Sequence, residues 1–172
     1  ILGTYFIQNR SNVRYDEISP NIINALIATE DIRFYSHSGI DFKRTFTILF
    51  HNLMGKKQGA STITQQLALN LFSEEGRATN HLKRFVQKLK ELIIAVKLER
   101  NYTKEEIITM YLNTVDFGSY NTFGIKSAAR TYFNTTPNKL SPEQAAVLVG
   151  MLRGTSLYSP IRSVPKPGEI RF

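Results

Sequence analysis

The carboxylate of Glu30 stands where the surrounding pattern calls for an apolar side chain. Within 20–30 the apolar residues that recur at helical spacing are Ile23, Leu26 and Ile27, and Glu30 continues their stripe. Burial and the carboxyl end of a helix both disfavour an anion, which suits such a group to general acid or base catalysis. The alternative is a structural carboxylate that binds Arg33 or His37 to hold the next turn. Periodicity alone favours neither.

A dense group of polar and aromatic residues follows Glu30. Asp31, Phe34, His37 and Gly39 complete the pattern E-D-x-x-F-x-x-H-x-G, which brings a second carboxylate and an imidazole into one turn. The cluster favours the functional interpretation of Glu30.

Lys88 and Glu91 form a second candidate pair. They are three residues apart in a long helical pattern and therefore share one face. A solvated charged face is the more common explanation for such a pair. Gln65 and Gln66 could also be ordinary residues at the start of a helix rather than site residues, and for Gln65 this is the preferred explanation.

Other kinds of site find no support in the sequence. The chain has no Cys, which excludes disulfides and thiolate metal sites, and no His, Asp and Glu spacing is typical of a metal site. We find no P-loop, no G-x-G-x-x-G after a strand and no G-x-S-x-G.

The elements that must position these residues are predicted to be mostly helices. The predicted helices cover 20–30 after Ser19, 42–54, 63–72 after Thr62, 82–100, 104–112 after Thr103, 125–133, and 141–152 with Ser141 as cap. Residues 1–18 are expected to form a short strand or an extended arm. The face of the long helix that is expected to be buried consists of Leu82, Phe85, Val86, Leu89, Leu92, Ile93 and Val96.

The segment 42–54 has two interpretations. Its apolar stripe predicts a core helix, whereas its basic flanks and several Phe residues are also typical of a helix that dips into a membrane interface.

Composition limits the classes of protein to consider. The 172 residues, 42% of them hydrophobic, are enough for one well-cored domain with a small second lobe. A net charge of +8 indicates an anionic partner, which is nucleic acid, an acidic membrane or a phosphorylated substrate. No apolar run approaches the roughly 20 residues of a membrane span. The absence of an initiator Met suggests a piece of a longer, membrane-anchored protein.

Four motifs, in this order, resemble those of the peptidoglycan glycosyltransferases, the transglycosylase domains of class A penicillin-binding proteins and their monofunctional relatives. They are EDIRFYSHSGID, QGASTITQQLALNLF, the stretch from KLKELIIAVKLERNYTKEE to SAARTYF, and LSPEQAAVLVGML followed by YSP. The resemblance runs from about residue 15 to 162. It implies one domain over 1–172 and a mainly α fold, with a lysozyme-like helical head lobe and a smaller membrane-associated jaw lobe.

The resemblance also implies an activity and roles for residues. Lipid II is polymerised into β-1,4-linked glycan and undecaprenyl pyrophosphate is released. Glu30 matches the catalytic base, and Glu91 matches the second catalytic Glu. Residues that match substrate-binding positions are Asp31, Phe34, His37, Ser61, Thr62, Gln66 and Lys88, with Arg77, Lys83 or Arg84 for a further cation. No resident cofactor is implied, and participation of a divalent cation, Mg²⁺ or Mn²⁺, stays open.

The implied partners are lipid II, the growing glycan chain and an anionic membrane at the extracytoplasmic (periplasmic) face, with a transpeptidase domain compatible with a full-length chain. Nucleic acid is not expected, because the basic residues are dispersed among apolar stripes. A lytic muramidase of similar fold and a degenerate scaffold domain are the rival hypotheses.

Three positions depart from the family pattern by lacking a cation that is common there: Leu69, Gln87 and Thr47. We expect Lys56, Lys57, Lys83 or Arg84 to replace the missing charge, because both Glu residues are present.

Overall fold

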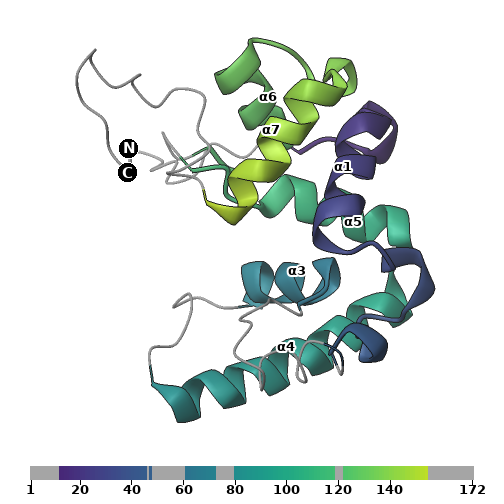
Figure 1. The fold of residues 1–172 in the computed structure, drawn as a ribbon, viewed down its shortest axis with the longest axis vertical. Coiled ribbons are helices and arrows are strands. Elements are labelled where there is room, and N and C mark those ends of the chain that lie inside the picture. Colours follow the sequence, from purple (N-terminus) through teal and green to yellow (C-terminus); the bar gives the residue numbers. More distant parts are fainter. Residues whose placement is uncertain (1–11, 46, 48–60, 73–79, 119–121, 155–172) are drawn as a thin grey trace, which may run out of the picture.

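The computed structural model describes residues 12–45, 47, 61–72, 80–118 and 122–154, and within these ranges the chain is mainly helical (Figure 1). The α-helices are α1 (Pro20–Glu30), α3 (Ile63–Phe72), α4 (His81–Asn101), α5 (Lys104–Thr114), α6 (Ile125–Phe133) and α7 (Pro142–Arg153). Among the described residues, the 3₁₀ turn η1 (Tyr15–Glu17) precedes α1, η2 (Phe34–Ser36) follows α1, and η4 (Pro137–Lys139) lies between α6 and α7. The prediction of a mainly α fold is confirmed.

The predicted capping residues begin their helices as expected. Thr103 and Glu106 form a complete capping box at α5, and Ser141 and Gln144 form another at α7. At α1 the Ser19 hydroxyl accepts a hydrogen bond from a backbone N–H of the first turn. The helix bounds therefore follow largely from local sequence.

Helix α3 lies at the centre of the arrangement. It packs against both α4 and α5, whereas α1 packs against α7. In Figure 1, α1, α6 and α7 gather above α5, and α4 runs along the opposite side of α3. The first turn of α3 is thus placed between α4 and the helices that carry the rest of the core.

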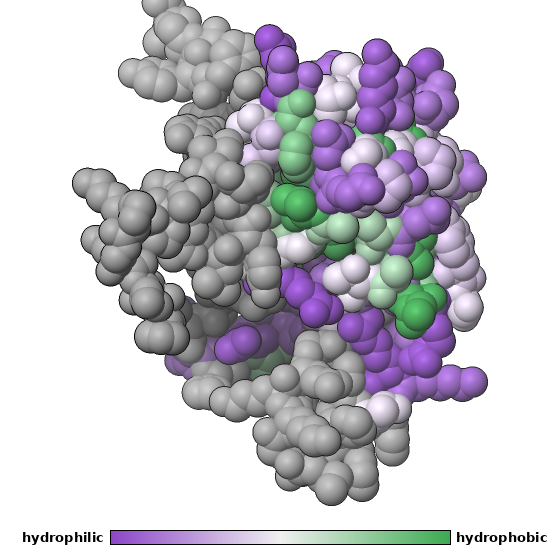
Figure 2. Space-filling model, turned by 45° about the horizontal axis from the view of Figure 1, so that its top comes forward, coloured by the Kyte–Doolittle hydropathy of each residue, from purple (hydrophilic) through white to green (hydrophobic). Residues whose placement is uncertain are grey.

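The core is formed mainly by α1, α3, α5, α6 and α7. Its largest fully buried side chains include Phe34, Tyr111, Phe117, Ile22, Leu26, Ile63, Leu67 and Leu112. The surface drawn in Figure 2 is mostly hydrophilic, with hydrophobic residues in smaller patches.

The prediction for the buried face of α4 is wrong. Leu82, Phe85, Val86, Leu89 and Ile93 are exposed, and Leu92 and Val96 are only partly buried. The residues of α4 that are buried are Ala95 and Leu98, which continue the face of Lys88 and Glu91 at helical spacing. The helix therefore packs through the face of Lys88, Glu91, Ala95 and Leu98 and presents the apolar stripe of its first half outward.

Two further predictions fall partly outside the described residues. Residues 42–45 and 47 are helical and Phe42 is exposed, but the remainder of 42–54 is not described. Residues 12–18 contain η1 rather than a strand, and 1–11 are not described. Among the described residues, no helix combines the length and apolarity needed to cross a membrane.

Gly39 allows the loop after α1 to pass close to α4. Its φ is +89°, and a Cβ at this position would lie 2.9 Å from the backbone carbonyl group of Ala95. The Gly39 carbonyl accepts hydrogen bonds from Thr62 Oγ1 at 2.7 Å and Gln65 Nε2 at 3.3 Å. The start of α3 is thereby attached to this loop.

Candidate active site

Glu30 is the last residue of α1, and its carboxylate contacts two other helices. Oε2 accepts a hydrogen bond from Gln66 Nε2 of α3 at 3.0 Å, and Oε1 lies 3.4 Å from Nε of Arg153 of α7. The Arg153 guanidinium also donates to the carbonyl of Thr29 at 3.1 Å. The Glu30 side chain is 15% exposed, so a mostly buried carboxylate still reaches the surface.

The structural alternative for Glu30 is wrong. Arg33 instead pairs with Asp41, with its Nε 2.8 Å and its Nη2 3.0 Å from the two carboxylate oxygens. His37 Nε2 lies 3.0 Å from Oδ2 of Asp31. Both local partners considered for Glu30 are thus engaged by other carboxylates, and neither holds Glu30.

The pair of Arg33 and Asp41 stabilises the loop that follows α1. Burial alone would raise the pKa of Asp41. This effect is outweighed by hydrogen bonds from Arg33 and from the backbone N–H of Arg44, and by the positive charge of Arg33. The pKa of Asp41 therefore lies below its ordinary value, and the carboxylate stays ionised as a fixed partner for both arginines.

Tyr111 fixes the orientation of the Gln66 amide. Its hydroxyl donates to Gln66 Oε1 at 2.9 Å, which leaves the amide nitrogen to donate to Glu30. Burial, and then the nearby charge of Glu30, raise the pKa of Tyr111 well above its ordinary value. The phenol therefore stays protonated and remains a donor. A relay from Tyr111 through Gln66 holds the Glu30 carboxylate.

Asp31 connects the first motif to the start of α3. Its side chain is fully buried, and Oδ2 accepts from the backbone N–H of Ile63 at 3.1 Å as well as contacting His37. Ile63 is the first residue of α3, where a carboxylate complements the helix dipole. Phe34 and Thr62 are also fully buried. Asp31, Phe34 and Thr62, predicted to bind substrate, are therefore buried in the protein, where they can hold neighbouring residues in place but are not exposed to a ligand.

Lys88 and Glu91 of α4 lie beside the start of α3. Lys88 Nζ donates to Ser61 Oγ at 2.9 Å, to Gln65 Oε1 at 3.2 Å and to Glu91 Oε2 at 2.9 Å. Their side chains are 41% and 13% exposed, respectively. The solvated-face interpretation of Glu91 is therefore wrong, since Glu91 belongs to a cluster between two helices.

Two adjacent residues of α3, Gln65 and Gln66, link this helix to the carboxylates of Glu91 and Glu30. Gln66 contacts Glu30, and Gln65 contacts Lys88, which binds Glu91. The structure thus brings both predicted catalytic residues to the same helical turn, together with Ser61.

The remaining predicted cations are spread differently. Arg84 and Lys83 are exposed on α4, with Arg84 four residues before Lys88. Arg77, Lys56 and Lys57 lie outside the described residues.

The three positions that lack the family's cation are also placed. Leu69 is partly buried on α3, and the Thr47 hydroxyl donates to the carbonyl of Lys43 in its own helical segment. Gln87 is partly buried on α4.

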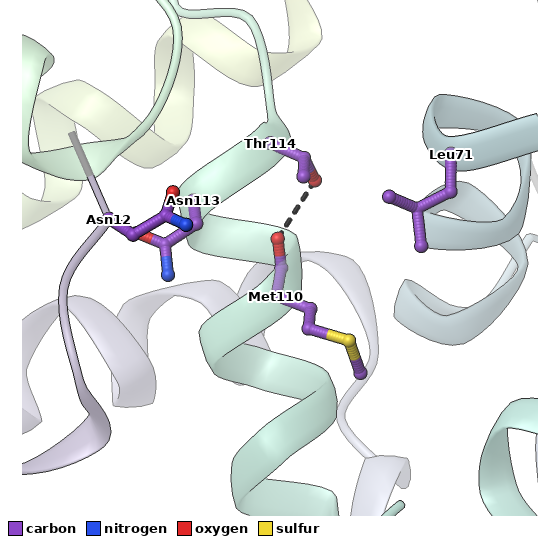
Figure 3. A pocket seen from close by; sticks show the side chains of 5 residues that line it. All are labelled: Asn12, Leu71, Met110, Asn113 and Thr114. Atoms are coloured by element: carbon purple, nitrogen blue, oxygen red, sulfur yellow. Dashed lines mark hydrogen bonds between the residues drawn. The ribbon is translucent and has the colours of Figure 1, made fainter. Parts of the chain in front are cut away.

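A separate pocket opens beside α5. Its volume is about 420 Å³, and it is lined by Asn12, Leu71, Met110, Asn113 and Thr114 (Figure 3). In the close-up Met110 and Thr114 of α5 project toward Leu71 at the end of α3. The Glu30 and Lys88 clusters contribute no residue to this lining.

Among the described residues no group of three or more His, Asp and Glu side chains could hold a metal ion.

Sequence reasoning did not anticipate Tyr111, Gln65 and Arg153 as parts of the site. Tyr111 and Gln65 fell into an apolar stripe and a helix start, and their polar atoms gave the only signal. Arg153 ends a helix, where a cation is expected for the dipole alone.

Comparison with known proteins places the chain in a family. A family model described as Transglycosylase matches residues 1–171. Penicillin-binding protein 1F of Bacillus subtilis is 40% identical over 172 residues, 99% of this chain and 23% of that protein. Penicillin-binding protein 2a of Streptococcus pneumoniae is 40% identical, over 91% of this chain and 20% of its own length. Penicillin-binding protein 1A of Escherichia coli is 36% identical, over 96% and 19%. The chain spans about a fifth of the length of these relatives. With the four motifs in order, a helical fold and a family match along nearly its whole length, this chain belongs to the transglycosylase family.

Proposed function

We propose that this domain is a peptidoglycan glycosyltransferase, which polymerises lipid II into β-1,4-linked glycan in bacterial cell-wall synthesis. The observation that carries the proposal is the Glu30 carboxylate, partly exposed and held by Gln66 and Arg153 in a chain of the transglycosylase family. An oriented carboxylate within reach of solvent is what a general base requires.

The proposed chemistry is an inverting displacement. Glu30 takes the proton from the 4-hydroxyl of the acceptor's N-acetylglucosamine, and the oxygen attacks C1 of the donor sugar. The bond from C1 to the pyrophosphate oxygen breaks, and undecaprenyl pyrophosphate leaves with that electron pair. Lys88, kept in place by Glu91, Ser61 and Gln65, is the proposed cation for the pyrophosphate.

The direct test is incubation with labelled lipid II and separation of the products by length. Growth of a ladder of glycan supports the proposal, whereas release of sugars from finished glycan would favour a lytic muramidase. The reaction is run with and without EDTA, because a divalent cation such as Mg²⁺ or Mn²⁺ would interact with pyrophosphate. We propose that no other cofactor takes part.

The proposed setting is the extracytoplasmic face of the cell membrane, within a longer anchored protein. The relatives are named penicillin-binding proteins and extend far beyond the matched part, which supports a neighbouring transpeptidase domain. We propose that α4, which carries exposed apolar side chains, belongs to the membrane-associated jaw lobe.

Membrane contact is proposed for the outward apolar stripe of α4, defined by Leu82, Phe85, Val86, Leu89 and Ile93. Apolar side chains interleaved with Lys83, Arg84 and Lys90 are suited to the interface of an anionic bilayer. The same helix presents Lys88 and Glu91 toward α3, so binding to the lipid surface would leave the cluster of Lys88 facing the protein.

The double variant Phe85→Ser and Leu89→Ser is expected to bind anionic liposomes several-fold more weakly than the parent, because apolar area is lost. Binding of the parent should weaken as salt rises. Co-sedimentation with liposomes measures both effects. The control is Ile32→Ser, which removes an exposed apolar side chain from the loop after α1, outside the stripe. Equal binding by the double variant and the control would contradict the assignment of this surface.

Leu69→Lys tests the missing cation on α3. If Lys83 or Arg84 already supplies the charge, an added Lys should leave turnover unchanged or lower it through repulsion, and this is the expected result. Alanine variants of Lys83 and Arg84 should then be the damaging ones. A gain of up to about tenfold in Leu69→Lys, corresponding to about 1.4 kcal/mol, with no loss in the alanine variants would overturn this expectation.

A further inference from the structure

Lys104 is a cation at the first position of a helix, which is the end where a positive charge is disfavoured. It follows the cap Thr103 at the start of α5. Glu99 is the corresponding case for an anion: it lies in the last turn of α4, where a negative charge is disfavoured. Neither charge is therefore explained by the stability of its own helix.

The two side chains form a largely buried ion pair. Lys104 Nζ lies 2.9 Å from Oε1 and 2.7 Å from Oε2 of Glu99. The Glu99 side chain is 4% exposed and that of Lys104 is 22% exposed. A buried pair of this kind loses its hydration and is weak evidence for a role in stability alone.

The contacts of the pair reach the loop that follows Glu30. Lys104 Nζ donates to the backbone carbonyl of His37 at 2.6 Å and lies 4.3 Å from the centre of the Phe34 ring. Lys104 therefore holds the backbone of the first motif, whose Asp31 in turn binds His37 and the start of α3.

The other partner reaches α3 itself. Glu99 Oε1 accepts a hydrogen bond from Thr64 Oγ1 at 2.6 Å. Thr64 lies in the first turn of α3, directly before Gln65 and Gln66. One ion pair thus joins the end of α4, the start of α5, the loop after α1 and the turn of α3 that holds Glu30.

We propose that Glu99 and Lys104 are positioning residues for the glycosyl transfer: their ion pair sets the loop 31–39 against the first turn of α3, so that Gln66 meets Glu30. The inference rests on the proposed function and deepens it. Neither residue touches the reacting atoms, and misplacement of a base by about 1 Å is enough to lower a rate by about 100-fold.

The test uses the double variant Glu99→Gln and Lys104→Met. Removing both charges avoids an unpaired buried ion, and the Gln keeps an acceptor for the Thr64 hydroxyl. With labelled lipid II, kcat is expected to fall by about tenfold or more. KM is expected to stay within about twofold, because Lys88 keeps its hydrogen bonds to Ser61 and Glu91, which lie outside the loop 31–39 and the turn 62–66.

A stability-matched control separates positioning from general weakening. Ile125→Val removes a methylene from the buried face of α6. Amide hydrogen exchange in 31–39 and 62–66 should be about tenfold faster in the double variant and unchanged in this control.

The outcomes are distinguishable. Unchanged exchange in the double variant, or unchanged kcat despite faster exchange, would overturn the positioning role. Equal loss of kcat in both variants would reduce the pair to a structural contribution. If the parent itself makes no glycan, the proposed function fails, whereas the exchange measurement still decides whether the pair orders the loop and α3.

Discussion

Replacing Glu30 by Gln is expected to lower glycan polymerisation by at least about 100-fold while the fold stays intact. The amide keeps the size of the side chain and can still face Gln66 and Arg153, but it cannot accept the proton of the acceptor hydroxyl. Turnover of labelled lipid II measures the loss, and circular dichroism with thermal unfolding checks the fold.

The matched control for Glu30 is Glu105→Gln. Glu105 is exposed in the first turn of α5, so its substitution removes the same charge from a site without Gln66 or Arg153. Its turnover should stay close to that of the parent. A Glu30→Gln variant as active as Glu105→Gln would exclude Glu30 as the base.

Lys88→Met should lower kcat/KM for lipid II by about tenfold to 100-fold. Each charge-assisted hydrogen bond contributes on the order of 1.5–3 kcal/mol, and the substitution removes the ammonium that we assign to the pyrophosphate. Because Glu91 would be left without its partner, Lys88→Met combined with Glu91→Gln is measured beside it. The loss should persist in the pair of substitutions.

Lys126→Met serves as the control for Lys88. Lys126 is exposed on α6, away from the Lys88 cluster and from the apolar stripe of α4. Its substitution changes the net charge equally, so a general electrostatic attraction of substrate would weaken in both variants. If Lys88→Met and Lys126→Met lost the same amount, the specific role of Lys88 would be refuted.

Local sequence signals were sufficient to predict where helices lie, but not which other elements each helix contacts. Capping residues such as Thr103 and Ser141 act on their own first turn, which is why the sequence predicts where α5 and α7 begin. Periodicity groups the residues of one face but does not say what that face contacts. The apolar stripe of α4 therefore suggested a core, although its polar face is the one that packs against α3.

The same distinction applies to the site. Glu30 could be predicted because a carboxylate interrupts an apolar stripe, and its neighbourhood could not, because its contacts come from distant segments. Gln66 and Arg153 are 36 and 123 residues away in the chain. Arg33 and His37, which are close in sequence, bind Asp41 and Asp31 instead. Tyr111 remained hidden because a buried aromatic residue at helical spacing is typical of a core.

The long separations between contacting residues determine when the site can assemble during synthesis. Asn113 binds the backbone of Val13 through both its amide oxygen and its amide nitrogen, the Ser19 hydroxyl donates to the carbonyl of Leu140, and Arg153 reaches Glu30. Contacts across 100 to 123 residues make folding slower than that of bundles with local contacts. On the ribosome, α1 emerges before α7, so the Glu30 carboxylate at the end of α1 must wait for Arg153. A nascent chain released before residue 153 would carry Glu30 without that partner, so translation itself delays the appearance of the complete site until α7 has been synthesised.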